Sequence, residues 1–152
     1  MQSNNGVALI IEGPDRKLLI LEEFVDKPRL KKRAGDNSTP MEEVVGAETD
    51  YQALLRLWRE ELPGMPPLPL PGKFIGQYQI VPSEWANLYA VTTAWRELPV
   101  EASDKPEVGN YRWLSLDQVL KLQLRPGARE MFEDHAVGVS GITRLFCIDY
   151  SR

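Results

Sequence analysis

The sequence of 152 residues is poor in the residues that build disulfides and structural metal sites. It contains one cysteine, Cys147, and one histidine, His135. A single cysteine cannot form an intramolecular disulfide, and the chain has no Cys/His cluster that could hold zinc. His135 stands near the end of a predicted helix, where a cation suits the helix dipole, and it has no second histidine to work with.

Long apolar runs and targeting signals are also missing. No run approaches the roughly 20 apolar residues that a membrane span needs. The segment Met1–Asn5 has neither the basic nor the apolar part of a secretory signal. We therefore expect a cytoplasmic protein with no membrane partner.

A surplus of basic residues is absent as well. The chain has 18 Lys and Arg against 22 Asp and Glu, a formal net charge of −4. Proteins that bind duplex nucleic acid usually carry a basic surplus, because neutralising phosphates supplies much of their affinity, so such a partner is not expected. The exception is Lys27–Arg33 (KPRLKKR), which is either a solvated loop or a phosphate-facing patch beside an active site.

The length and the composition, with 43% hydrophobic and 26% charged residues, predict one domain over residues 1–152. Gly6–Glu12 and Lys17–Val25 form a predicted hairpin around Gly13–Arg16, and Gly35–Pro40 is a turn cluster. The best helix is Glu48–Leu62, which Thr49 or Asp50 can cap and Pro63-Gly64 ends. The remaining elements are strands at Lys73–Val81, Asn87–Arg96, Tyr111–Leu114 and Ile142–Tyr150, and helices at Ser115–Leu122 and Pro126–Ala136. This order, without regular βα alternation, predicts an α+β fold with a mixed β-sheet flanked by helices.

Five prolines lie between Pro63 and Pro71 (PGMPPLPLP). Such a stretch is extended or polyproline-like. It serves either as the connection from helix to strand or as a ligand for an aromatic-groove domain, in which case the chain is an interaction protein.

The main helix has a predicted core face and a predicted polar face. At 100° per residue the core stripe consists of Tyr51, Leu54, Leu55, Trp58 and Leu62. Arg56 and Glu60 project to the other side, and Glu61 sits at the border. Leu57 stands among the polar positions, one turn before Glu60 and Glu61, so we expect these three side chains to meet. Adjacent glutamates are typical of a solvated surface, but with Glu48 at the helix start they also suit Mg²⁺ or Mn²⁺.

These residues resemble the box of the Nudix (MutT-like) hydrolases, G-x5-E-x7-R-E-U-x-E-E-x-G-U, where U is a bulky apolar residue. Glu48, seven residues, and then Arg56-Leu57-Trp58-Arg59-Glu60-Glu61 reproduce E-x7-R-x-U-x-E-E in register. The segment Pro40–Glu48 (PMEEVVGAE) stands where members often have PGGxxxxGE. The resemblance covers nearly the whole chain and implies the family's α/β/α sandwich.

The box is degenerate at three places. Glu42 replaces the opening glycine, Leu57 replaces the glutamate after the arginine, and the closing glycine comes one place late, at Gly64. In the family the missing glutamate helps bind metal or activate water. Glu42 and Glu43 are acidic residues in a normally glycine-rich loop, where they either replace the missing carboxylate or are exposed loop charges.

The resemblance implies a Mg²⁺- or Mn²⁺-dependent enzyme that cleaves a diphosphate linkage in a nucleoside diphosphate joined to another moiety. It assigns metal binding to Glu60 and Glu61, with Glu48 as support and Glu107 as a further ligand or base, and it gives Arg56 the role of orienting a box glutamate. The predicted ligand is a nucleotide-type small molecule, for which Tyr78, Trp85, Tyr89 and Trp95 are stacking candidates, and a homodimer is common in the family.

Two hypotheses follow from Leu57. Either the chain is an active hydrolase with a degenerate box, or it is a catalytically impaired Nudix-fold module that binds a nucleotide or regulates a partner. If Leu57 occupies the vacant carboxylate position, Leu57→Glu should strengthen metal binding and raise any hydrolytic rate.

Overall fold

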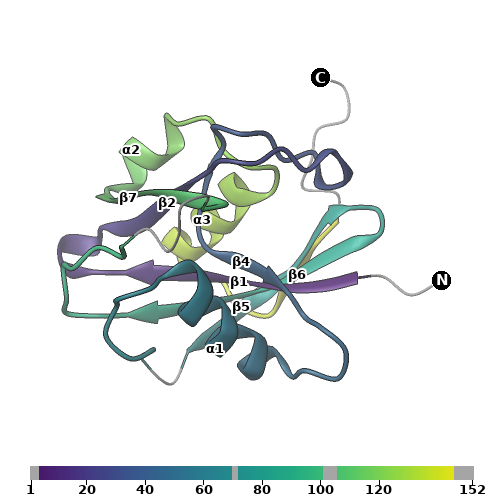
Figure 1. Ribbon diagram of the computed structural model, residues 1–152, viewed down its shortest axis with the longest axis horizontal. Helices are drawn as coiled ribbons and strands as arrows, with labels where there is room; N and C mark the ends of the chain where they lie inside the picture. Colours follow the sequence, from purple (N-terminus) through teal and green to yellow (C-terminus); the bar gives the residue numbers. More distant parts are fainter. Residues whose placement is uncertain (1–3, 70–71, 101–105, 146–152) are drawn as a thin grey trace.

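The computed structural model describes residues 4–69, 72–100 and 106–145. Its centre is a mixed sheet with the strand order β3-β2-β1-β6-β5-β8, to which β4 adds by pairing with β1 and β7 by pairing with β2 (Figure 1). The strands are β1 (Asn4–Glu12), β2 (Leu18–Glu23), β3 (Asn37–Ser38), β4 (Met41–Glu43), β5 (Lys73–Val81), β6 (Glu84–Thr92), β7 (Val108–Leu114) and β8 (Ile142–Arg144). The helices are α1 (Asp50–Glu61), α2 (Leu116–Leu120) and α3 (Ala128–Val137), with short 3-10 turns at Pro14–Arg16 and Pro28–Leu30.

Two strand pairs are parallel, β1 with β6 and β5 with β8, and the other pairs are antiparallel. The predicted hairpin is present, with Glu12 opposite Leu18. This mixed sheet with helices confirms the expected α+β fold. No helix in the described part of the chain is long and apolar enough to cross a membrane.

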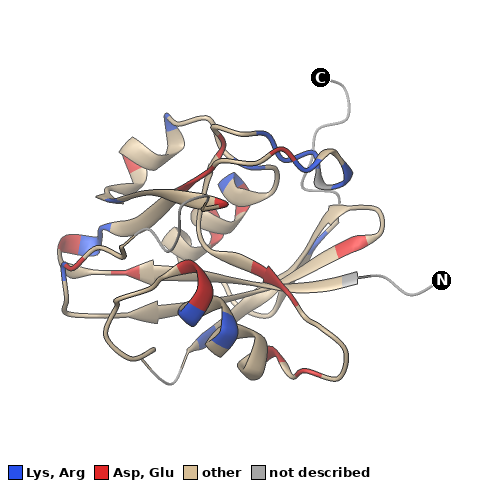
Figure 2. Cartoon of the chain, in the orientation of Figure 1, with Lys and Arg blue, Asp and Glu red and all other residues tan. Residues whose placement is uncertain are grey.

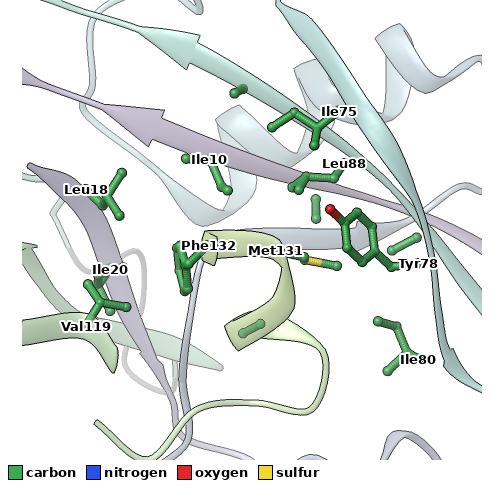
Figure 3. Packing of buried hydrophobic residues seen from close by; sticks show 14 of the residues in the cluster. Ile10, Leu18, Ile20, Ile75, Tyr78, Ile80, Leu88, Val119, Met131 and Phe132 are labelled. Atoms are coloured by element: carbon green, nitrogen blue, oxygen red, sulfur yellow. The ribbon is translucent and has the colours of Figure 1, made fainter. Parts of the chain in front are cut away.

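The strand β1 separates two apolar layers because its side chains alternate between the faces of the sheet. Ala8 and Ile10 pack with Met131 and Phe132 of α3, on the side shown in Figure 3. Val7, Leu9 and Ile11 belong instead to the layer formed with α1. Helices therefore cover both faces of the sheet, as in the α/β/α sandwich that the family resemblance implied.

Several predicted boundaries move in the structure. The strand expected at Asn87–Arg96 spans Glu84–Thr92, and the turn cluster Gly35–Pro40 contains the short strand β3. Both differences come from pairing with distant segments, β1 and β2 respectively, which local turn residues do not reveal. The end of the last predicted strand, residues 146–150, lies outside the described residues, as do residues 70–71 of the proline-rich stretch. His135 contacts Glu12, with Nε2 and Oε1 3.0 Å apart.

Candidate functional site

The helix expected at Glu48–Leu62 is present as α1, Asp50–Glu61, with one of its predicted caps. Thr49 is the N-cap, and its hydroxyl accepts a hydrogen bond from the Gln52 backbone while the Gln52 side chain accepts one from the Thr49 backbone. This reciprocal capping box satisfies two backbone donors that the first turn leaves open. The helix ends at Glu61, so the last residue of the predicted metal-binding pair lies at its C-terminus.

The buried face of α1 agrees with the predicted one at Leu54, Trp58 and Leu62 and differs from it elsewhere. Tyr51 and Leu55 are exposed, whereas Ala53 and Leu57 are fully buried in the layer against β1. Leu57 therefore does not share a surface with Glu60, and the expectation that Leu57, Glu60 and Glu61 meet is wrong. The helix is rotated so that Ala53, Leu57 and Glu61, at intervals of four, follow one another on the covered side. Glu61 is thus the polar end of a buried stripe.

A cavity of about 100 Å³ lies at this end of α1, between β4, the starts of β1 and β6, the end of β2 and the segment before β7. The carboxylates that line it are Glu23, Glu42, Glu43, Glu61, Glu84 and Glu107. The cations that line it are Lys27, Lys32 and Arg125. Figure 2 shows acidic residues on β4 and α1 and basic residues in the loop that follows β2. The cavity is therefore strongly acidic, with cations along one part of its wall.

Glu61 is the most perturbed carboxyl group of this cavity. Burial raises its pKa well above the ordinary value, and the charges of Glu23 and Glu42 raise it further, against the opposing effect of Arg125 and Lys32. The backbone carbonyl of Glu61 accepts a hydrogen bond from the Tyr111 hydroxyl, which fixes the helix end. A carboxylate held among other carboxylates is stabilised by a bound cation, because the cation offsets their mutual repulsion.

Glu42 reaches the same cavity from β4. It stands directly opposite Val7 on β1, so the two side chains share the face of the sheet that α1 covers. Its Oε1 lies 3.4 Å from Nη1 of Arg56. Its neighbour Glu43 is more exposed and is held by Arg29 Nη2 at 2.8 Å.

Arg56, on α1, extends its side chain to the loop between β4 and α1. Its Nε and Nη2 donate to the two carboxylate oxygens of Glu48 at 3.0 and 3.1 Å, and Nη2 also donates to the backbone carbonyl of Glu43. The hydrogen bonds with Glu48, and the charge of Glu42, raise the pKa of Arg56. The same bonds, together with a hydrogen bond from the Val45 backbone, lower the pKa of Glu48. Arg56 and Glu48 thus tie the loop that carries Glu42 to the helix.

The four predicted metal-binding residues are not brought together. Glu61 and Glu107 line the cavity, whereas Glu48 is bound to Arg56 and Glu60 points outward, 3.5 Å from Arg56. Glu107 is largely exposed and lies 3.7 Å from Lys27. No group of three acidic, histidine or cysteine side chains among the described residues has the arrangement of a finished metal cluster. The cavity does fit an ion that takes a few carboxylates and keeps most of its waters, as Mg²⁺ does.

The cavity also contains residues that the sequence did not single out. Glu23 is buried and holds Lys32 at 3.4 Å and Arg125 at 3.1 Å. A signal for it was present, because Glu23 has the same strand parity as Leu19 and Leu21 and should point inward with them. Arg125 is separated from Glu23 by 102 positions, so their contact could not be read from local pattern.

The four aromatic residues considered for stacking on a ligand differ in whether they line the cavity. Trp85 lines the cavity, whereas the Tyr78 hydroxyl is buried and donates to Asp134 at 2.8 Å. The Tyr89 hydroxyl donates to Asp50 at 2.6 Å. Trp95 packs edge-on against Trp58, with ring centroids 5.6 Å apart. Trp85 is therefore the aromatic residue of the four that a ligand in this cavity can reach.

Residues 3–135 match the family model of the NUDIX domain. The chain belongs to the NUDIX domain family. Solved structures agree with this assignment at the level of the fold. The chain is similar to the Escherichia coli ORF135 protein, with 24% identity over 90% of this chain and 91% of that one and a TM-score of 0.65.

Two further solved structures are similar at lower identity. One is the NUDIX domain of Shewanella oneidensis NrtR complexed with ADP ribose, with 16% identity, coverage of 90% and 88% and a TM-score of 0.66. The other is the E. coli dihydroneopterin triphosphate pyrophosphohydrolase, with 15% identity, coverage of 91% and 100% and a TM-score of 0.62. No curated protein sequence matches the chain.

Proposed function

We propose that this NUDIX chain is a divalent-metal-dependent hydrolase of a diphosphate linkage in a nucleoside diphosphate joined to another moiety. The observation that carries the proposal is the carboxyl group of Glu61, which lies in an acidic cavity with a raised pKa beside Glu42 and Glu23. A partly buried carboxyl group of this kind, with charged neighbours in a cavity, is typical of functional sites.

Glu61 and Glu42 would hold the ion, and Glu107 at the rim of the cavity would serve as a further ligand or base. In this assignment Glu42, at the position of the box's opening glycine, supplies a carboxylate in place of the box glutamate whose position Leu57 occupies. Glu48 and Glu60 act through Arg56, which anchors the loop of Glu42 by direct contacts. A divalent ion bound there would withdraw negative charge from the phosphate oxygens of the substrate.

The cations of the cavity wall have a separate role. Lys32 and Arg125 are buried against Glu23, and Lys27 lies at the rim beside Glu107. Burial lowers the pKa of Lys32, while the attraction of Glu23 opposes that effect. These side chains would orient phosphate oxygens, and the Trp85 ring would contact the organic part of the substrate.

The test is hydrolysis of a panel of nucleoside triphosphates, ADP-ribose, dinucleoside polyphosphates and nucleotide sugars with Mg²⁺ and with Mn²⁺. Wild type, Glu61→Gln and the control Glu133→Gln, which changes an exposed glutamate on α3, are compared. We expect metal-dependent turnover in wild type and Glu133→Gln and a loss of at least about 100-fold in Glu61→Gln, the lower range for removing a group used in catalysis.

A second function, nucleotide binding without hydrolysis, is favoured by one observation. Leu57 lies in the core, so the box glutamate of the family has no counterpart at its own position. The NrtR NUDIX domain complexed with ADP ribose shows a nucleotide-type ligand on the same fold. Saturable binding of ADP-ribose without turnover of any panel member would support this function and contradict the first.

A further inference from the structure

A second, larger cavity of about 990 Å³ lies beside the carboxylate cavity. It is bounded by the loop between β2 and β3 and by the segment that connects α2 to α3. Its size is within the range of small-molecule sites, which are usually about 300–1,000 Å³. Lys32 and Arg125 line both cavities and separate them.

The wall of this cavity is basic. Its cations are Lys31, Lys32, Arg33, Arg125 and Arg129, and its acids are Asp26, Asp36 and Glu130. Two of the acids are already used within the protein. Asp26 accepts a hydrogen bond from the Ala34 backbone, and Asp36 accepts hydrogen bonds from the Arg33 backbone and from Gln123. Burial raises the pKa of Glu130, which favours its neutral form.

The N-terminus of α3 opens into the same cavity. This helix has ten residues, and its N-cap is Gly127, so no side chain caps the first turn. Pro126, Gly127 and Arg129 all line the cavity. The Ala128 N–H is already used, since it donates to the Arg125 backbone carbonyl, but the helix dipole still favours an anion at this helix start.

Arg125 provides an independent observation. Its side chain is nine-tenths buried, and its Nη1 donates to Glu23 at 3.1 Å. Its Nε is buried without a hydrogen-bond partner among the described residues. Arg125 lines the second cavity, and Glu23 satisfies only part of its hydrogen-bonding capacity, so the guanidinium brings to this wall a positive charge that protein contacts do not fully satisfy.

We propose that this second cavity is a binding site for a phosphate-type oxyanion, held by the start of α3, Arg33, Arg125 and Arg129. Guanidinium groups and helix N-termini both match the geometry and charge of phosphate. The site shares Lys32 and Arg125 with the first cavity but contains none of its carboxylates, so phosphate binding there can be tested without any hydrolysis. The phosphate is either a free ion or part of a nucleotide whose remainder passes Lys32 and Arg125 into the first cavity.

The test is a titration of the full chain with inorganic phosphate at pH 7 and constant ionic strength, followed by amide nuclear magnetic resonance. We expect saturating shifts at Gly127, Ala128 and Arg129. Arg33→Gln should weaken binding about two- to fivefold, the effect of removing one exposed charge near a bound anion. Arg96→Gln is the matched control, because Arg96 is exposed and pairs with Asp15 outside the cavity.

A second variant tests whether loss of a negative charge from the wall changes phosphate affinity in the opposite direction to loss of a positive one. Glu130→Gln removes an acid from the wall and should leave phosphate binding unchanged or make it tighter. Non-saturating shifts spread over the surface, or equal losses in Arg33→Gln and Arg96→Gln, would overturn the proposal. Glu61 lines only the first cavity, so Glu61→Gln should bind phosphate as wild type does. Phosphate binding that persists in a protein without hydrolytic activity would therefore contradict the hydrolase proposal and leave this one intact.

The two sources of phosphate are separated by a titration with adenosine diphosphate. Binding at least tenfold tighter than that of inorganic phosphate, with a shift of the Trp85 indole in the first cavity, would identify a nucleotide phosphate. Equal affinities without a Trp85 shift would identify a free phosphate site. Either result supports the oxyanion site.

Discussion

Arg56 holds Glu48 through two hydrogen bonds, from Nε to Oε2 at 3.0 Å and from Nη2 to Oε1 at 3.1 Å. The same guanidinium lies 3.4 Å from Glu42. One arginine on α1 therefore connects the helix to the loop before it and to the carboxylate that we assign to the metal ion.

Replacement of Arg56 by lysine should lower both stability and activity. A lysine ammonium cannot reproduce the two parallel hydrogen bonds of the guanidinium fork. We expect a lower Tm and a fall in metal-dependent activity of about tenfold or more, since a small misplacement of a catalytic group has effects of this size or larger. Arg59→Lys is the matched control, because Arg59 is exposed on the same helix. Equal effects of the two substitutions would contradict the anchoring role.

The pairing with Arg56 also predicts a dependence on pH. Arg56 and the Val45 backbone lower the pKa of Glu48 in the folded protein. A carboxyl group with a lowered folded pKa stabilises the protein above its unfolded pKa, about 4.3 for glutamate, and loses that contribution as the pH falls. Wild type should therefore lose more stability than Glu48→Gln between pH 5 and pH 3, as measured by urea unfolding. Parallel losses in the two proteins would show that the pair contributes nothing.

Glu61 should behave in the opposite direction. Its raised pKa means that the folded state binds the proton more tightly, so its contribution is present below the unfolded pKa and is lost as the pH rises through the folded value. Without metal, Glu61→Gln should raise the Tm at pH 7 and leave it little changed at pH 4. Added Mn²⁺ should raise the Tm of wild type more than that of the variant. A lower Tm for Glu61→Gln at pH 7 would contradict the repulsion that we assign to this cavity.

The burial of Leu57 predicts that its substitution lowers stability and does not raise activity. It is fully buried against β1, so Leu57→Ala should cost about 2–5 kcal/mol by opening a cavity in the core. Leu57→Glu should cost at least as much, because it places an unpaired carboxylate in apolar surroundings. It should not strengthen metal binding, contrary to the expectation from the sequence. Leu55→Ala is the control on the same helix and should change stability by less than about 1 kcal/mol, since Leu55 is 40% exposed.

The sequence predicts the fold well because its signals are local. The capping residues of α1, the Pro-Gly that follows it and the apolar run of β1 each define an element from neighbouring residues. The face of α1 was harder to predict. Leu55 and Leu57 are equally apolar, and which of them is buried depends on how the helix docks on β1.

The site could be predicted only in part for a related reason. Glu61 and Arg56 follow from the spacing of the box, but the contact of Glu23 with Arg125 joins residues far apart in the chain. The proposed replacement of the lost carboxylate by Glu42 depends on the pairing of β4 with β1, and a strand of three residues is too short to predict from its sequence pattern. The cytoplasmic location and the homodimer stay predictions from the sequence.

The most direct test of the central claim is Mn²⁺ binding at pH 7, measured by isothermal titration calorimetry on wild type, Glu61→Gln, Glu42→Gln and Glu133→Gln. The account predicts saturable binding in wild type and Glu133→Gln, with at least about tenfold weaker binding in each of the two cavity variants. Unchanged Mn²⁺ affinity in both cavity variants would contradict it, because the ion would then bind away from Glu61 and Glu42.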